Sequence, residues 1–418
     1  MNKISIIGTG YVGLVTGAGM AEFGNKVICS DIDKKKIDNL KSGILPIYEP
    51  GLEEVINRNR RDERLSFSSD VKQSIQNSDV IVIAVGTPEG EDGQADMSFV
   101  FSVAEKVSNN INNYKLVVTK STVPIGSGKK IIDLINKKIN NPKLFDYVSN
   151  PEFLREGSAL KDFLWPDRVI IGTSSSKAYE IMRNVYRPLY INKNPITHTS
   201  VETAEMIKYA SNSFLALKIS YINEIANLCE SVGADVHNVA SAMGKDGRIS
   251  DKFLHPGPGF GGSCFPKDLE ALLSISKNNN VKMETVEAAI KANKKQKKRM
   301  FEKLINLFNG NIEKKKIAVL GLSFKANTDD IRESSSINMI NSIISNGGFV
   351  NAYDPIANNE MSKIIKGVDY FNSLYEAVNE VNAIVIMTEW NEFRSLDLKK
   401  IKSKMSGNIF LDTRNIIN

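Results

Sequence analysis

A glycine-rich turn between two apolar segments near the start of the chain limits the fold more than any other feature. Residues 3–8 predict a strand, and residues 10–23 predict a helix. The turn between them reads Gly8-Thr9-Gly10-Tyr11-Val12-Gly13. Glycines at this spacing allow a tight bend, close approach of a phosphate and close packing of helix on strand. The turn therefore predicts a β-α-β unit whose helix N-terminus binds phosphate.

An acidic residue at the end of the next strand-like segment extends this interpretation. Asp31 closes residues 26–31 and stands 18 positions after Gly13. Its carboxylate would accept hydrogen bonds from both hydroxyls of an adenosine ribose and repel a 2′-phosphate, which favours NAD over NADP. Three lysines at 34–36 weaken this preference. A tight turn that binds no ligand is the alternative.

Apolar segments elsewhere indicate the fold class. Residues 80–86, 115–119 and 169–172 are continuously apolar rather than alternating, which is typical of strands buried on both faces in a parallel sheet flanked by helices. The C-terminal part repeats this order, with a strand at 316–321, a helix around 336–345 and further strands at 349–354 and 382–386. The sequence therefore predicts an α/β fold with two Rossmann-like parallel-sheet domains.

A helical region separates the two predicted sheets. Apolar residues recur at steps of three or four from 199 to 231, and Thr199 with Glu202 forms a plausible capping box. The apolar residues extend beyond one stripe, which suits a buried central helix or a dimer core. The helical pattern continues to about residue 309.

Composition and cysteine usage exclude several classes of protein. With 42% hydrophobic and 24% charged residues, the chain resembles an ordinary soluble globular protein. Its three cysteines form no set for disulfides or zinc, the predicted N-terminal strand leaves no room for a signal peptide, and no apolar run approaches 18 residues. We expect a cytoplasmic protein without a metal or a membrane segment. The basic run 294–299 lacks aromatic residues, so we interpret it as a solvated helix face rather than a nucleic-acid interface.

The run Gly259-Phe260-Gly261-Gly262-Ser263-Cys264-Phe265-Pro266-Lys267-Asp268 contains the strongest chemical signal. It places a thiol just before Pro266, which looks like the first residue of a helix. The positive end of a helix, with Lys267 nearby, favours the thiolate and nucleophilic attack. A buried, inert cysteine is the ordinary alternative, but this glycine-rich setting favours the nucleophile.

Three further places offer polar residues. Lys208 and Asn212 share one helix face and suit oxyanion stabilisation or water orientation, although a snorkelling lysine is the alternative. Residues 150–157 and 121–124 each follow a strand and suit substrate handling at the carboxyl edge of the sheet. In the second copy the fingerprint is missing, and Lys325 and Arg332 (the latter expected after a helix start) either bind a different nucleotide or are surface charges.

Together these motifs closely resemble the UDP-glucose/GDP-mannose dehydrogenase family over essentially the whole chain. The segments that carry the resemblance are 8–13, 48–52, 86–88, 121–124, 151–157, 166–168, 208–212, 259–268, 324–325 and 330–334. The resemblance implies an NAD-binding domain at 1–197, a central helical and dimerisation domain at 198–310, and a UDP-sugar-binding domain at 311–418.

The resemblance also implies a reaction. Two NAD-dependent oxidations would take C6 of UDP-glucose to the carboxylate of UDP-glucuronate through a cysteine thiohemiacetal and thioester. A homodimer or higher homo-oligomer is implied as well. Oxidation of UDP-N-acetylmannosamine or GDP-mannose is the nearest alternative, and a non-catalytic NAD-sensing module is a remote one.

Roles for individual residues follow from the same resemblance. The implied catalytic residues are Cys264, Lys208, Asn212, Asp268, Thr122, Glu152 and Glu156. The implied NAD-binding residues are Gly8, Gly10, Tyr11, Val12, Gly13, Asp31, Lys36, Thr87, Thr122, Glu156, Lys267 and Arg332. The implied substrate-binding residues are Glu152, Phe153, Leu154, Arg155, Glu156, Lys208, Asn212, Arg248 (from the neighbouring subunit), Phe253, Leu254, His255, Pro256, Gly257, Gly261, Lys325 and Arg414.

Overall fold

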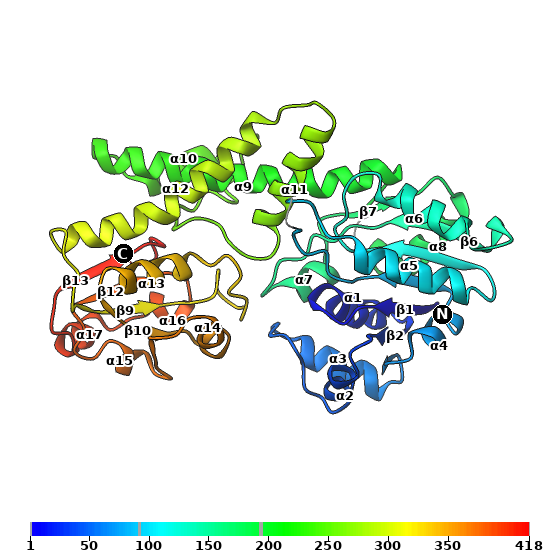
Figure 1. Cartoon of the computed structure of the whole chain (residues 1–418), viewed down its shortest axis with the longest axis horizontal. Coiled ribbons are helices and arrows are strands. Elements are labelled where there is room, and N and C mark those ends of the chain that lie inside the picture. The colour runs from blue at the N-terminus through cyan, green and yellow to red at the C-terminus, as the bar shows by residue number, and fades with distance from the viewer. Residues whose placement is uncertain (1, 91–92, 192–194, 418) are drawn as a thin grey trace. The chain divides into compact units, whose positions relative to one another are not determined.

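The computed structural model describes residues 2–90, 93–191 and 195–417, and the chain folds as two compact units, Met1–Ala210 and Ser211–Asn418 (Figure 1). The long helix α9 (Val201–Val232) contains the boundary between these units. The two sheets and the helical region between them confirm the predicted fold class. The division at 1–197, 198–310 and 311–418 stays a prediction.

The first unit contains an eight-stranded sheet in the order β3-β2-β1-β4-β5-β6-β7-β8. The strands are β1 (Lys3–Ile7), β2 (Lys26–Ser30), β3 (Leu65–Ser68), β4 (Val80–Ile83), β5 (Lys115–Thr119), β6 (Phe145–Ser149), β7 (Val169–Gly172) and β8 (Ile196–Thr199). Strands β1 to β6 pair in parallel, as the continuous apolar segments predict. Strand β7 runs antiparallel to β6, and β8 runs parallel to β7.

Helices cover both faces of this sheet. They are α1 (Tyr11–Glu22), α2 (Lys34–Lys41), α3 (Leu52–Arg61), α4 (Val71–Gln76), α5 (Ser98–Asn110), α6 (Ser127–Asn136), α7 (Ala159–Leu164) and α8 (Ser176–Val185), with 3-10 turns at Pro142–Leu144 and Arg187–Ile191. Ile6 and Val82 lie in the core formed with α1, α3, α7 and α8, whereas Ile81 and Val117 lie in the core formed with α4, α5 and α6. Burial on both faces explains the continuous apolar segments.

The start of α9 differs from the sequence prediction. Thr199 ends β8, where it pairs with Gly172, so it is not the helix cap. Ser200 takes that place, because its Oγ accepts a hydrogen bond of 3.2 Å from the backbone N–H of Thr203. The proposed capping box of Thr199 with Glu202 is therefore wrong by one residue.

The second unit contains the rest of α9, further helices and a five-stranded parallel sheet in the order β11-β10-β9-β12-β13. The strands are β9 (Lys316–Leu320), β10 (Phe349–Tyr353), β11 (Asp369–Tyr370), β12 (Ala383–Ile386) and β13 (Ile409–Asp412). The helices are α10 (Val236–Gly244), α11 (Phe265–Asn278), α12 (Glu284–Leu307), α13 (Ser335–Ser345), α14 (Asn358–Ile364), α15 (Leu374–Ala377), α16 (Asn391–Arg394) and α17 (Leu398–Lys404).

The second sheet repeats the strand order of β3-β2-β1-β4-β5 in the first, which confirms the predicted internal repeat. One detail was wrong. Arg332 and Glu333 precede α13 instead of following its start, because Ser334 caps that helix at the backbone N–H of Ser336.

The repeat extends to an acidic residue at the end of the second strand. Asp354 follows β10 as Asp31 follows β2, and each accepts backbone hydrogen bonds from the first strand's turn. Oδ2 of Asp354 also accepts the indole N–H of Trp390 at 3.1 Å, and Oδ1 accepts the backbone N–H groups of Ile356 and Ala357 at 2.9 Å. Asp354 is therefore a buried structural residue.

The basic run 294–299 lies on α12 and is only partly solvated. Lys294, Lys295 and Lys298 are exposed, but Gln296 and Lys297 are buried. Lys297 donates 2.8 Å to the backbone oxygen of Glu333 beside α13, so part of this run contributes to packing. None of the helices in the described part of the chain has the length and apolar character needed to cross a membrane.

Candidate active site

The predicted cofactor residues of the first unit gather at one edge of its sheet. The glycine-rich turn follows β1, Asp31 follows β2, Thr87 follows β4 and Thr122 follows β5. The segment 150–158 follows β6. Because these strands are parallel, their carboxyl ends meet at the same edge, which is where open α/β sheets bind ligands.

The glycines of the first turn have separate geometric functions. Gly8 has a φ of 104°, and a Cβ on Gly13 would lie 2.0 Å from the backbone oxygen of Gly8. Only glycine therefore lets α1 approach β1 this closely. No atom lies within 4 Å of a Cβ position built on Gly10, so the turn is open there, beside the backbone N–H groups of Tyr11 and Val12. This open turn fits the pyrophosphate of a dinucleotide.

Asp31 lies against the same turn. Its Oδ2 accepts hydrogen bonds from the backbone N–H and the hydroxyl of Thr9 at 2.9 and 2.7 Å, and Lys36 Nζ lies 3.4 Å away. Burial opposes ionisation, but hydrogen bonds from Thr9 and Asp33 hold the pKa of Asp31 below its usual value. An ionised carboxylate at this position fits an unphosphorylated ribose. Lys36 is engaged by Asp31, whereas Lys34 and Lys35 are exposed.

Two other predicted cofactor residues contact each other. The hydroxyl of Thr87 donates 2.9 Å to the backbone oxygen of Thr122. This bond joins the loops after β4 and β5, which are neighbouring strands.

A buried ion pair joins two predicted catalytic residues. Lys208 Nζ donates 2.7 Å to Oε1 of Glu152, and the two side chains are 4% and 5% exposed. Oε2 of Glu152 accepts the backbone N–H of Leu154 at 2.6 Å. Burial alone would raise the pKa of Glu152, but the charge and hydrogen bond of Lys208 hold it below its usual value. Lys208 is therefore not a snorkelling lysine.

A second buried lysine, which sequence reasoning missed, lies beside this pair. Lys120 Nζ contacts the backbone and side-chain oxygens of Asn150 at 3.4 and 3.3 Å, and the hydroxyl of Tyr186 also donates to that side chain. Burial lowers the pKa of Lys120 to about 8; Lys208 acts in the same direction and Glu152 opposes it. Its position directly before Ser121-Thr122-Val123-Pro124 was the available signal.

The rest of the segment 150–157 is held by residues that the sequence did not single out. Arg168 stacks 3.9 Å from the centre of the Phe153 ring, and Lys208 Nζ lies 5.5 Å from the same ring. Arg155 pairs with Asp162 of α7 through its backbone N–H and its Nε, both at 2.9 Å. The structure thus places Arg155, a predicted substrate ligand, in an internal ion pair.

The second unit carries the predicted nucleophile. Helix α11 begins at Phe265, so Cys264 is its N-cap and Pro266 is the second helical residue rather than the first. Cys264 is half-buried, and Sγ lies 3.6 Å from the hydroxyl of Ser263. The thiol is therefore at the positive end of a 14-residue helix.

Three further predicted residues of this unit form one polar cluster. Asn212 on α9 donates 2.6 Å to Oδ2 of Asp268, and Lys267 donates 2.7 Å to Oδ1. Asp268 is 1% exposed and stands one helical turn after Cys264, whose backbone oxygen accepts its N–H. The charge of Lys267 is thus compensated by Asp268.

The predicted substrate segment 253–261 is fixed by polar side chains from α9, α12 and the C-terminal sheet region. Its backbone atoms contact Asn223, Asn293, Gln296, Ser335 and Asn415. A Cβ on Gly261 would lie 2.2 Å from the backbone oxygen of Glu333, so this position requires glycine. Leu254, Pro256 and Gly257 are buried, Phe253 is half-buried and His255 is exposed.

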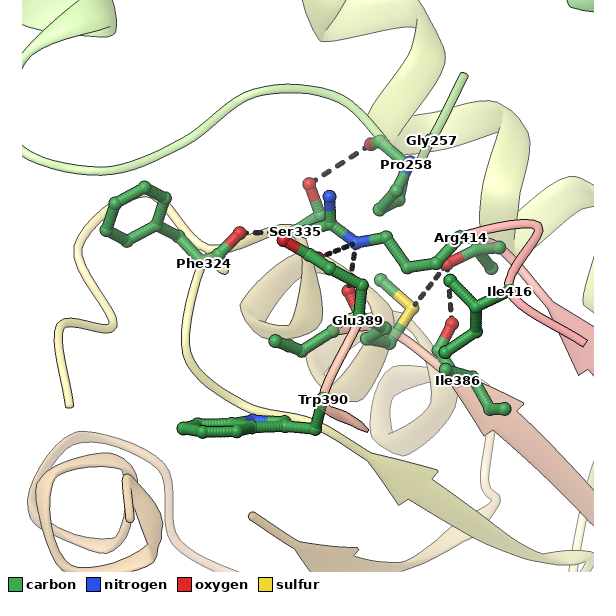
Figure 2. A network of polar contacts seen from close by, with 12 residues as sticks. Gly257, Pro258, Phe324, Ser335, Ile386, Glu389, Trp390, Arg414 and Ile416 are labelled. Carbon is green, nitrogen blue, oxygen red and sulfur yellow. Dashed lines mark hydrogen bonds and ion pairs between the residues drawn. The ribbon is translucent and has the colours of Figure 1, made fainter. Parts of the chain in front are cut away.

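Arg414 organises the neighbouring loops (Figure 2). Its guanidinium donates 2.7 Å to the backbone oxygen of Phe324 and 2.8 Å to that of Met387, and it lies 3.2 Å from Glu389. The Phe324 contact orders the residue directly before Lys325, whose Nζ lies 5.5 Å from the Phe324 ring. Arg414 thus connects 324–325 with the loop after β12.

Two predicted arginines lie on the surface of this unit. Arg248 is 91% exposed and pairs with Asp246 at 2.6 Å, and Arg332 pairs with Asp330 at 2.7 Å. Among the residues that the structure describes, no group of three or more His, Cys, Asp or Glu side chains could hold a metal ion.

Comparisons with known proteins identify the family. Residues 2–190 match the NAD binding domain of the UDP-glucose/GDP-mannose dehydrogenase family, residues 202–295 match its central domain, and residues 318–418 match its UDP binding domain. The NAD binding match confirms the predicted cofactor.

Individual relatives agree with this match. A UDP-glucose 6-dehydrogenase of Rhizobium meliloti (strain 1021) is 48% identical over 99% of this chain and 95% of its own length. The solved UDP-glucose dehydrogenase of Pyrobaculum islandicum is 35% identical with a TM-score of 0.93, over 100% of this chain and 95% of that one. The UDP-D-ManNAc dehydrogenase of Pyrococcus horikoshii is 29% identical with a TM-score of 0.87, over 99% and 96%.

Proposed function

The chain belongs to the UDP-glucose/GDP-mannose dehydrogenase family, and we propose that it is an NAD-dependent UDP-glucose 6-dehydrogenase. It would oxidise C6 of UDP-glucose to the carboxylate of UDP-glucuronate. The observation that carries the proposal is Cys264 at the N-cap of α11, one turn before the Asn212–Asp268–Lys267 cluster. A simple alcohol dehydrogenase needs no such nucleophile.

The NAD site would be formed by the open turn 8–13, Asp31, Lys36, Thr87 and Thr122, with Glu156, Lys267 and Arg332 as further ligands. NAD, when bound, accepts one hydride in each of the two oxidations. Asp31 would hold the adenosine ribose, and the N–H groups at the start of α1 would hold the pyrophosphate.

In the first oxidation the C6 hydroxyl loses a proton and C6 loses a hydride. Lys208 and Asn212 would stabilise the negative charge that develops on the C6 oxygen, because a buried cation and a fixed amide donor do so without reorganisation. Asp268 would position the water that takes up the proton, assisted by Thr122, Glu152 and Glu156. The product of this step is an aldehyde.

Cys264 then retains the aldehyde. Its thiolate adds to C6 to form a C–S bond, and the carbonyl oxygen takes up a proton to give a thiohemiacetal. Loss of a proton from that oxygen and of a second hydride from C6 yields a thioester. Water adds to the thioester, the C–S bond breaks, and the carboxylate and the Cys264 thiolate are released with two protons.

The UDP-sugar would be held by Phe153, Leu154, Arg155, residues 253–257, Gly261, Lys325 and Arg414. The internal contacts of Arg155 and Arg414 support a role in shaping this site, and Arg248 would come from a neighbouring subunit. UDP-glucose is preferred to UDP-N-acetylmannosamine as substrate because the relative named for it is 48% identical, against 29% for the one named for UDP-D-ManNAc. The three free cysteines suit a cytoplasmic location.

Product stoichiometry tests this proposal. We expect two NADH per UDP-glucose and no aldehyde in a carbonyl trap, with GDP-mannose and UDP-N-acetylmannosamine turned over more slowly. Cys264→Ala should abolish glucuronate formation, whereas Cys264→Ser should stall at a bound intermediate because an alkoxide leaves poorly. Cys29→Ala, at a buried cysteine outside the site, is the matched control. One NADH per sugar, or glucuronate from Cys264→Ala, would overturn the mechanism.

A further inference from the structure

Glu49 is a buried carboxylate in the motif 48–52, and the proposed reaction gives it no role. It is 6% exposed and lies in the segment before α3. Its neighbours come from two parts of the first unit that are far apart in sequence. One is the glycine-rich turn at the start of α1, and the other is the segment 150–160 after β6.

Both oxygens of Glu49 are occupied. Oε2 accepts the hydroxyl of Tyr11, the first residue of α1, and also the backbone N–H of Gly157 at 2.7 Å. The same N–H lies 2.9 Å from the Tyr11 hydroxyl oxygen. Oε1 accepts the backbone N–H of Leu160 at 3.3 Å. Glu49 thus connects the NAD turn with the residue that directly follows Glu156.

The direction of these hydrogen bonds is well defined. Burial and the neighbouring Glu49 carboxylate raise the pKa of Tyr11 far above its ordinary value, and the charge of Glu156 acts in the same direction. Tyr11 therefore stays a phenol and donates. Burial raises the pKa of Glu49, but the hydrogen bonds from Tyr11, Leu160 and Gly157 oppose that shift.

We propose that Glu49 is a positioning residue that ties the loop carrying Glu156 to the NAD turn through Tyr11. The proposal rests on the proposed function, in which Tyr11 and Glu156 serve the reaction. Binding of NAD against the turn then determines where Glu156 lies. A purely structural Glu49, which only holds residues 157 and 160, would leave the Tyr11 contact without consequence.

Three variants separate these two roles. Tyr11→Phe removes only the link to the NAD turn, Glu49→Ala removes every contact, and Glu49→Gln keeps an oxygen that can accept from Tyr11 and Gly157. Positioning predicts that Tyr11→Phe and Glu49→Ala each lower kcat and raise the KM for NAD by about tenfold, whereas Glu49→Gln changes both by about threefold or less. Glu53→Ala, at an exposed glutamate on α3, is the matched control and should change neither.

The double variant Glu49→Ala/Tyr11→Phe gives the decisive measurement. If both residues act through one connection, its kcat should equal that of the weaker single variant. Wild-type kcat and KM for NAD in Tyr11→Phe, or multiplied losses in the double variant, would overturn the proposal. Both readings remain possible if Glu49→Ala does not fold, because Glu49→Gln and Tyr11→Phe keep most contacts.

Direct titration with NAD distinguishes this proposal from the proposed function. If UDP-glucose is not the substrate, wild-type protein shows no turnover with it, but its NAD affinity is still measurable. Tyr11→Phe should weaken that affinity about tenfold. Unchanged affinity would reject the positioning role whatever the sugar.

Discussion

Asp31 decides the cofactor because its charge lies where an additional phosphate would lie. The carboxylate is ionised and already holds Lys36 at 3.4 Å. Asp31→Asn removes the repulsion and releases Lys36, so we expect the ratio of kcat/KM for NADP to that for NAD to rise at least about tenfold. Asp33→Asn, at the neighbouring exposed aspartate, is the control. An unchanged ratio would show that the lysines 34–36 control the preference.

The Lys208–Glu152 pair affects stability as well as chemistry. Lys208→Met leaves the buried carboxylate of Glu152 without its closest cation, which should lower the free energy of unfolding by about 3–5 kcal/mol in urea titrations. Lys208→Met/Glu152→Gln should recover part of this loss, because no buried charge is left unpaired. If the double variant is less stable than Lys208→Met, electrostatics is not the cause.

At the scale of single elements, Glu205 connects α9 with the start of α6. Its carboxylate accepts the backbone N–H groups of Gly126 and Gly128 at 2.6 and 2.7 Å, four to six residues after Thr122. Burial raises the pKa of Glu205 to about 7, and the charge of Glu202 acts in the same direction. A pKa raised by folding stabilises the protein below the unfolded pKa, and that stabilisation is lost as the pH rises through 7.

The consequence is a stability change that depends on this one side chain. Between pH 5 and pH 8 the wild-type free energy of unfolding should fall by about 2 kcal/mol relative to Glu205→Gln, which cannot ionise. Urea titrations at both pH values measure this, with the exposed Glu202→Gln as control. Parallel pH profiles for wild type and Glu205→Gln would contradict the assignment.

Elements and motifs with local signals were predictable, and contacts between distant segments were not. Residues 115–119 and 169–172 match β5 and β7, because apolar β-branched runs mark buried strands. The start of α9 was misplaced because Thr199 is used by β8, which no local pattern reveals. In the site, Cys264 and Asp268 were found by their spacing. The links of Lys120 to Asn150 and of Arg155 to Asp162 depend on how strands and helices are arranged in space.

At the scale of the whole molecule, α9 presents apolar residues to solvent in the single chain. Phe214, Tyr221 and Leu228 are exposed and recur every seven residues, and Val232 follows them. This spacing keeps them on one side of the helix, which supports the proposed dimer. Phe214→Glu/Leu228→Glu should shift the sedimenting mass from twice 46.3 kDa to the single-chain value. Leu398→Glu, on α17, is the control, and a wild-type monomer would contradict the proposal.

The exposed Arg248 allows a test of whether subunits share sites. Arg248→Ala and Cys264→Ala should each be inactive alone. If Arg248 serves the neighbouring subunit, mixing the two after dissociation restores one complete site in each heterodimer, or about a quarter of wild-type activity. No recovery from heterodimers that are shown to form would place Arg248 in its own subunit's site.

Asp354 has a consequence for how far the two halves of this chain could exchange functions. On paper, Ser323→Gly and Ala326→Gly would restore the spacing of Gly8, Gly10 and Gly13 to the second half. The ribose would still find no acceptor, because backbone groups, the Ser323 hydroxyl and the Trp390 indole already occupy the Asp354 carboxylate. Designing a second dinucleotide site there would first require rebuilding the interior of that half.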